Sequence, residues 1–121
     1  MAGYVDGFVL PVPKKKLAAY RKMAQLGAQV WKDHGALGYF ECVAEDLTPQ
    51  MGTMGFDKLA KLKKGETAIF SWIVYRDRAH RDRVNAKVAK DPRMNDPALM
   101  KAMPFDMKRM AMGGFDVLVA W

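Results

Sequence analysis

Two carboxylates stand among aromatic residues and could do acid–base chemistry. Asp6 lies between Tyr4 and Phe8, and Glu41 follows Tyr39 two positions later, both in segments with strand-like patterns. An apolar environment raises the pKa of a carboxyl group, which suits a general acid or base near neutral pH. Asp6 and Glu41 are therefore candidate catalytic residues.

Each candidate also has a structural interpretation, which we favour. Asp6 would pair with Arg109 on a neighbouring strand or bond to backbone amides, because buried charges are normally paired. Glu41 would reach water from an edge strand. His34 ends a predicted helix, where an imidazolium interacts favourably with the helix dipole. Its functional alternative is a proton shuttle at the mouth of a cleft.

Arg93 and Arg109 are the cations best placed to bind an anionic group through two hydrogen bonds. Each could instead fix its own loop through Asp91 or Asp106. The chain has two histidines and one cysteine, Cys42, with no close spacing among them, so we expect no metal site. No glycine-rich phosphate-binding loop is present, and we expect no cofactor.

The apolar pattern predicts four strands and two long helices. The strands are expected over residues 4–12, 37–44, 67–75 and 108–120, the long helices over 14–34 and 76–90, and short helices over 56–62 and 98–103. Gly113 and Gly114 predict a bulge or bend in the last strand. The order βαββαβ predicts a ferredoxin-like α+β fold, in which a four-stranded antiparallel sheet carries both long helices on one face. We expect a single domain over residues 1–121.

Both faces of the two central strands are apolar. On strand 67–75 one face carries Phe70 and Trp72 and the other carries isoleucines. We expect Asp6 and Glu41 on the Phe70 and Trp72 face. Two helices cover one face only, and a soluble monomer rarely exposes a large aromatic patch. A second copy of the same sheet is the simplest cover, which predicts a homodimer.

The net charge is +7, from 20 Lys and Arg against 13 Asp and Glu. Residues 76–83, RDRAHRDR, interleave acids with arginines, which is more typical of a solvated helix face than of a phosphate track. The RNA-binding pattern of ferredoxin-like sheets lacks its aromatic residues after Lys64-Gly65, so we expect no specific nucleic acid. No apolar run approaches the roughly 18 residues of a membrane span, and we expect a cytoplasmic protein without membrane contact.

Five segments carry a family resemblance over most of the chain: YVDGFVLPVP, DHGALGYFEC, GETAIFSWIVYRDRAHRD, NAKVAKDPRM and MPFDMKRMAMGGF. They resemble the YbaA-like family (domain of unknown function 1428) of the dimeric α+β barrel superfamily. The resemblance implies a ferredoxin-like protomer whose sheet packs on its partner's sheet, and it implies no activity, cofactor or catalytic residue. More distant members of the superfamily include cofactor-independent monooxygenases, haem-degrading enzymes and small-ligand sensors, which is an analogy of fold only.

The leading functional hypothesis is binding, or cofactor-free conversion, of a small hydrophobic or aromatic molecule in a cleft of the barrel. Aromatic and methionine side chains with few polar groups are the usual lining of such clefts. The expected ligand-binding residues are Tyr4, Phe8, Tyr39, Trp72, Arg93 and Arg109. The alternative is a non-enzymatic homodimeric module that binds an acidic partner or nucleic acid through its basic surface.

Overall fold

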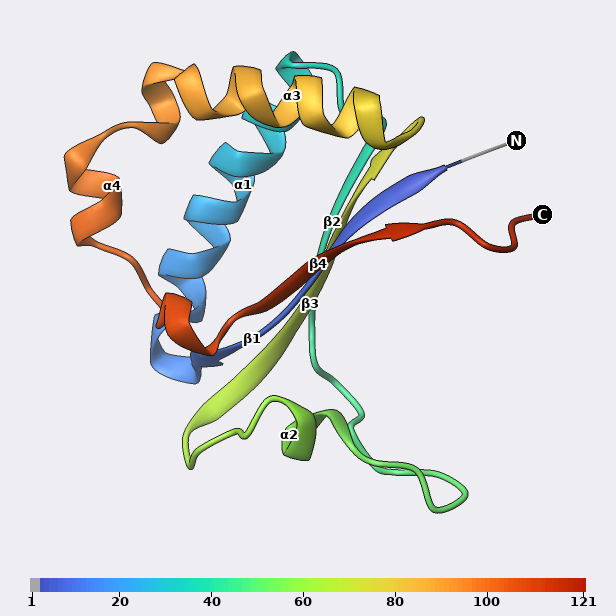
Figure 1. Ribbon diagram of the computed structural model, residues 1–121. Coiled ribbons are helices and arrows are strands. Elements are labelled where there is room, and N and C mark those ends of the chain that lie inside the picture. Colours follow the sequence, from blue (N-terminus) through green and yellow to red (C-terminus); the bar gives the residue numbers. More distant parts are fainter. Residues whose placement is uncertain (1–2) are drawn as a thin grey trace.

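Four strands form one antiparallel sheet, and the two long helices lie on the same face of it (Figure 1). The computed structural model describes residues 3–121. The strands are β1 (Tyr4–Pro13), β2 (Gly38–Val43), β3 (Glu66–Tyr75) and β4 (Ala111–Asp116), in the sheet order β2-β3-β1-β4. The helices are α1 (Leu17–Asp33), α2 (Phe56–Leu59), α3 (Arg78–Lys90) and α4 (Pro97–Lys101), with short 3-10 turns at Lys14–Lys16, Pro92–Met94 and Met107–Arg109. This arrangement confirms the predicted ferredoxin-like fold.

Helix α1 buries one stripe of side chains against the sheet. Its buried residues are Tyr20, Ala24, Gly27 and Val30, at the three- and four-residue spacing of a helix face. Gly35 follows the helix with a φ of 103°, in the left-handed region that favours glycine. The predicted end of this helix is therefore confirmed.

Helix α3 begins two residues later than predicted because Asp77 caps it. The Asp77 carboxylate accepts a hydrogen bond from the backbone amide of His80 at 2.7 Å. The His80 ring in turn accepts one from the backbone amide of Arg76 at 3.0 Å. The first bond satisfies an amide that the first turn leaves without a partner, and the second gives the ring of the buried His80 a hydrogen-bond partner in the residue before the cap.

The strand register places Asp6 and Glu41 on the face that the helices cover. Asp6 pairs with Ile73, and Glu41 pairs with Ser71. Residues paired across antiparallel strands share one face. The expectation that both carboxylates lie on the Phe70 and Trp72 face is therefore wrong.

The last strand has no bulge at Gly113-Gly114, so this part of the prediction of a bulge or bend is wrong. Strand β1 pairs with β4 in unbroken register through both glycines. These glycines leave space for neighbouring aromatic rings. A Cβ atom on Gly114 would collide with the ring and hydroxyl of Tyr4. On the opposite face, a Cβ atom on Gly7 or Gly113 would lie 3.4 or 3.6 Å from the Phe115 ring.

The face of the sheet away from α1 and α3 is apolar and largely open, and we call it the open face. Phe40, Phe70 and Phe115 on this face are 48%, 47% and 60% exposed. The segment that contains α2 lies on this side (Figure 1) and covers one end, where the rings of Phe56 and Phe70 are 6.0 Å apart. Trp72 stacks on Phe40 at 5.0 Å near the middle.

Candidate functional site

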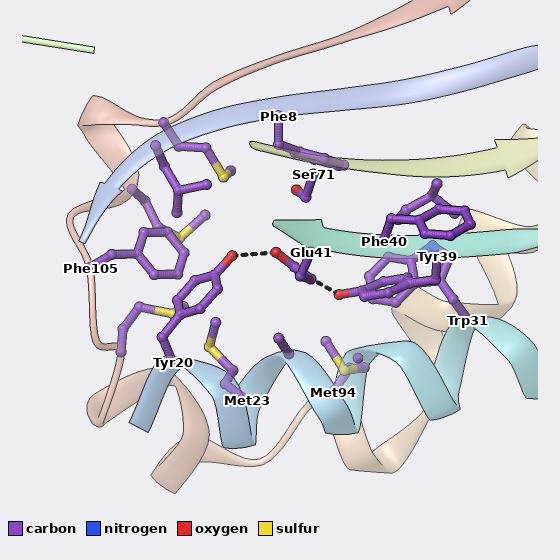
Figure 2. Close-up of a pocket in the computed structure, with 17 residues that line it drawn as sticks. Phe8, Tyr20, Met23, Trp31, Tyr39, Phe40, Glu41, Ser71, Met94 and Phe105 are labelled. Carbon is purple, nitrogen blue, oxygen red and sulfur yellow. Dashed lines mark hydrogen bonds between the residues drawn. The ribbon is translucent and has the colours of Figure 1, made fainter. Parts of the chain in front are cut away.

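A cavity of about 240 Å³ lies between the helix-covered face of the sheet and helix α1 (Figure 2). Aromatic residues from β1, α1, β2 and the chain after α4 line it: Phe8, Tyr20, Trp31, Tyr39, Phe40 and Phe105. Five methionines complete much of the wall: Met23, Met94, Met103, Met107 and Met110. A cavity of about 150 Å³ in a protein core can bind benzene, so this one has room for a ring with a short side chain.

One carboxylate, that of Glu41, borders this apolar cavity. Glu41 accepts a hydrogen bond from the Tyr20 hydroxyl on one oxygen and from the Tyr39 hydroxyl on the other, each at 2.8 Å (Figure 2). Burial, followed by the charge of Glu41, raises the pKa of both phenols. Both tyrosines therefore stay protonated near neutral pH and hold the carboxylate as hydrogen-bond donors.

Helix α1 admits this arrangement because residue 27 is glycine. A Cβ atom at this position would lie 2.8 Å from the Tyr39 hydroxyl oxygen, closer than van der Waals contact allows. Glycine in the middle of a helix costs about 1 kcal/mol relative to alanine. The absence of a side chain at Gly27 leaves space for the Tyr39 hydroxyl to reach Glu41, which offsets this cost.

A wider groove of about 440 Å³ adjoins the cavity along α1 and the edge strand β2. The cavity and the groove share four lining residues: Tyr20, Ala24, Tyr39 and Glu41. The hydrogen-bonded group Tyr20–Glu41–Tyr39 therefore stands between the apolar interior and a more polar outer surface. Arg21 lines the groove but not the cavity.

Asp6 lies in a separate buried network and does not line the cavity. It is 2% exposed and accepts hydrogen bonds from Arg81 at 3.1 Å and from Asn85 at 3.3 Å. Arg81 also donates to the Tyr4 hydroxyl at 3.1 Å and lies 5.0 Å from the centre of its ring. The expectation that Asp6 pairs with Arg109 is wrong, because its arginine partner is Arg81 on α3.

His34 and Arg93 belong to an ion-pair cluster where α1 and α3 end. The His34 ring lies 2.8 Å from Asp91, and Arg93 binds Asp91 at 2.7 Å and Asp33 at 2.8 Å. Hydrogen bonds from Arg93 and then from His34 hold the pKa of Asp91 well below its usual range. The cluster ties the segment after α3 to the end of α1, and neither His34 nor Arg93 lines the cavity.

Arg109 fixes the loop before β3. Its guanidinium donates to both oxygens of Glu66, at 2.6 and 2.9 Å, and to the backbone oxygen of Lys61 at 2.9 Å. These bonds, with one from the Lys63 amide, lower the pKa of Glu66 to about 2. The guanidinium of Arg109 is thus paired with the Glu66 carboxylate, and Arg109 does not line the cavity.

This pair predicts a pH-dependent contribution to stability. The pKa of Glu66 in the folded state lies below its usual value of 4.5, so the contribution is present above that pH and is lost as the pH falls towards 2. We expect Arg109→Gln to lower the free energy of unfolding near pH 7, and to lower it much less near pH 2.5. Urea unfolding at both pH values measures this, with the exposed Lys108→Gln as control. An equal loss at both pH values would contradict the assignment.

Trp72 lies on the open face of the sheet, with its ring stacked on Phe40. Cys42 shares that face and is exposed. Within residues 3–121, no group of three or more His, Cys, Asp and Glu side chains is placed to hold a metal ion. None of the helices in this range is long and apolar enough to cross a membrane.

The arginines of residues 76–83 are partly engaged within the chain. Arg81 reaches the buried Asp6 and also lies 2.9 Å from Asp82. Arg78 lies 3.7 Å from Asp82, one helical turn away. These contacts follow the interleaving of acids and arginines in this helix.

Of the residues expected to bind a ligand, Phe8 and Tyr39 line the cavity, and so does the catalytic candidate Glu41. Sequence reasoning missed Tyr20 and Trp31 as cavity residues, and it expected methionines in the lining without naming any of them among the ligand-binding residues. One signal was present: on the buried stripe of α1, the small residues Ala24 and Gly27 lie between Tyr20 and Trp31. Small residues between large ones on a buried face leave space against the sheet.

Solved structures with the same fold have little sequence in common with this chain. A dimeric ferredoxin-like protein from an uncultured marine organism matches with a TM-score of 0.57, at 12% identity and with all of both chains covered. A NIPSNAP family protein of unknown function from Agrobacterium tumefaciens also matches with a TM-score of 0.57, at 16% identity over 95% of this chain and 87% of its own. These matches show the fold alone.

Sequence relatives are much closer. The uncharacterized protein YbaA of Escherichia coli K12 is 43% identical over 116 residues, which cover 96% of this chain and 97% of YbaA. The YbaA of Shigella flexneri matches to the same extent. The family model described as a protein of unknown function, DUF1428, matches residues 3–107. The chain therefore belongs to the DUF1428 family, to which no function has been assigned.

Proposed function

We propose that the protein binds a small hydrophobic or aromatic molecule in the cavity between the sheet and α1. The observation that carries the proposal is an apolar, largely aromatic cavity of about 240 Å³ with a single carboxylate at its wall. An apolar lining with a few fixed polar groups is the usual composition of small-molecule sites. Glu41 orients the ligand, and it is also the cavity group that could accept a proton in a cofactor-free conversion.

We further propose that two copies pair through the open face to form a homodimeric barrel. The exposed rings of Phe40, Phe70 and Phe115 make an apolar surface of the kind that soluble monomers rarely expose. Two sheets pack face to face about 10 Å apart, with their side chains interdigitated. A protein of the same fold is described as dimeric, which supports this arrangement.

A cavity-filling substitution tests the binding proposal. Ala24 is 8% exposed and lines the cavity, so Ala24→Leu places three further carbon atoms in it. The probes are 2-phenylethylamine, 2-phenylethanol and phenylacetate, which share one ring and differ in the charge of a short side chain. We expect at least one probe to bind the wild type with a Kd of about 1 mM or tighter, and Ala24→Leu to abolish that binding.

Titration calorimetry and ligand-observed NMR measure the binding, and thermal unfolding checks the fold of each variant. Ala19→Leu is the matched control, since it makes the same change on the exposed side of the same helix. If no probe binds, or if Ala24→Leu binds as well as Ala19→Leu, the cavity is not the binding site.

A further inference from the structure

Glu41 differs from every other carboxylate of residues 3–121 that is at least partly buried. Asp6, Asp91 and Glu66 each bind an arginine, at 3.1, 2.7 and 2.6 Å respectively. No Lys, Arg or His nitrogen in this range lies within 4.0 Å of the Glu41 carboxylate. Charged groups removed from water are normally paired, but among residues 3–121 the charge of Glu41 has no counterion within 4.0 Å.

The hydrogen-bonding groups around the cavity are mostly acceptors. The hydroxyl protons of Tyr20 and Tyr39 are engaged by Glu41, and the Trp31 indole N–H is engaged by Asn85 at 3.1 Å. A carboxylate with two oxygens offers about four acceptor positions, of which these phenols occupy two. Among the side chains that line the cavity, only the Ser71 hydroxyl remains as an unengaged donor. A ligand must therefore bring its own donor, and an anionic ligand would find little to bind.

The aromatic residues of the cavity wall also favour a positively charged ligand. Rings of Phe, Tyr and Trp present a negative face, and a cation within about 6 Å of a ring is stabilised by it, most strongly when desolvated. Six aromatic residues line the cavity. The overall charge of +7 opposes a cation only weakly, because salt largely screens exposed charges that lie more than about 8–10 Å away.

Building on the proposed binding function, we infer that the ligand is an organic monocation: an amine with a small apolar or aromatic body, its ammonium group on Glu41 and its body among the rings. The bound ammonium group supplies the counterion that residues 3–121 do not. The Tyr20 and Tyr39 hydroxyls hold the carboxylate in place for it.

The three probes separate this inference from the proposed function. We expect 2-phenylethylamine to bind the wild type about tenfold or more tightly than 2-phenylethanol, and phenylacetate to bind most weakly. Glu41→Gln keeps the shape of the side chain and removes its charge. It should weaken binding of the amine about tenfold or more, and by a larger factor than it weakens binding of the alcohol.

Glu45→Gln is the matched control, since it removes one acidic charge at an exposed residue that does not line the cavity. Binding of the alcohol to Glu41→Gln shows that the cavity of the variant is intact. If the alcohol or the acid binds the wild type as tightly as the amine, or if Glu41→Gln leaves amine binding unchanged, the inference is wrong while the proposed function stands. If none of the three probes binds, both are wrong.

Discussion

Phe115→Asp is expected to convert the proposed homodimer into a monomer that keeps its fold. Phe115 lies on the open face of the edge strand β4 and is 60% exposed in one chain. Burying that ring against a partner contributes about 2–3 kcal/mol, and a carboxylate in its place costs more. Because the change occurs in both copies of a two-fold interface, the loss doubles to about 6 kcal/mol, or roughly 10⁴-fold in Kd.

Sedimentation equilibrium at micromolar concentration should give twice the mass of one chain for the wild type and a single chain for the variant. Met112→Asp is a close control: it lies on the same strand, is 61% exposed, and lies on the helix-covered face instead. That variant should remain dimeric. Trp72→Asp, at the middle of the open face, should abolish the dimer and also weaken the protomer. A monomeric wild type, or a Phe115→Asp dimer of unchanged affinity, would contradict the barrel.

Asp6→Asn is expected to destabilise the fold strongly without affecting the cavity. The substitution removes the charge that faces Arg81 and turns an amide N–H₂ group towards other donors. Asn85 cannot rotate to accept from it, because its Oδ1 atom already accepts from Trp31 and Tyr75 at 3.1 and 3.2 Å. Breaking a buried ion pair by removing one partner costs about 3–5 kcal/mol, which for a chain of this length is roughly 10 °C or more in Tm.

Thermal and urea unfolding measure this loss, and binding of the aromatic probes is the second readout. Asp82→Asn removes the other carboxylate that contacts Arg81, one whose side chain is 57% exposed. We expect it to cost less than about 1 kcal/mol, as exposed ion pairs do. The opposite result, a stable Asp6→Asn variant that has lost ligand binding, would show that Asp6 serves the site after all.

The strands and long helices were predictable because their apolar periods are local properties of the chain. The face of the sheet on which Asp6 lies was not predictable in this way. Alternation within β1 separates Asp6 from its neighbours Val5 and Gly7, but only the register with β3 decides whether Asp6 lies beside Ile73 or Trp72. A shift of one residue between two strands exchanges the faces, and both faces of this sheet are apolar.

The cavity was predictable only in part, for a related reason. Tyr39 and Glu41 share a face because they lie two apart on one strand, which the sequence indicates. Tyr20 joins them through the rotation and position of α1 over the sheet, which depend on packing. Met103 and Phe105 come from the chain between α4 and the final 3-10 turn, where no apolar period marks which side chains turn inward.

The first strand of the chain occupies an interior place in the sheet, between β3 and β4. During synthesis it emerges early, yet its two neighbours are Glu66–Tyr75 and Ala111–Asp116, far later in the chain. At about 5–20 residues per second, translation reaches the start of β3 roughly 3–10 s after β1 is complete. For that time β1 has neither neighbour to pair with. The sheet order thus sets a minimum time during which the nascent chain is exposed to aggregation, and the time that folding takes is added to it.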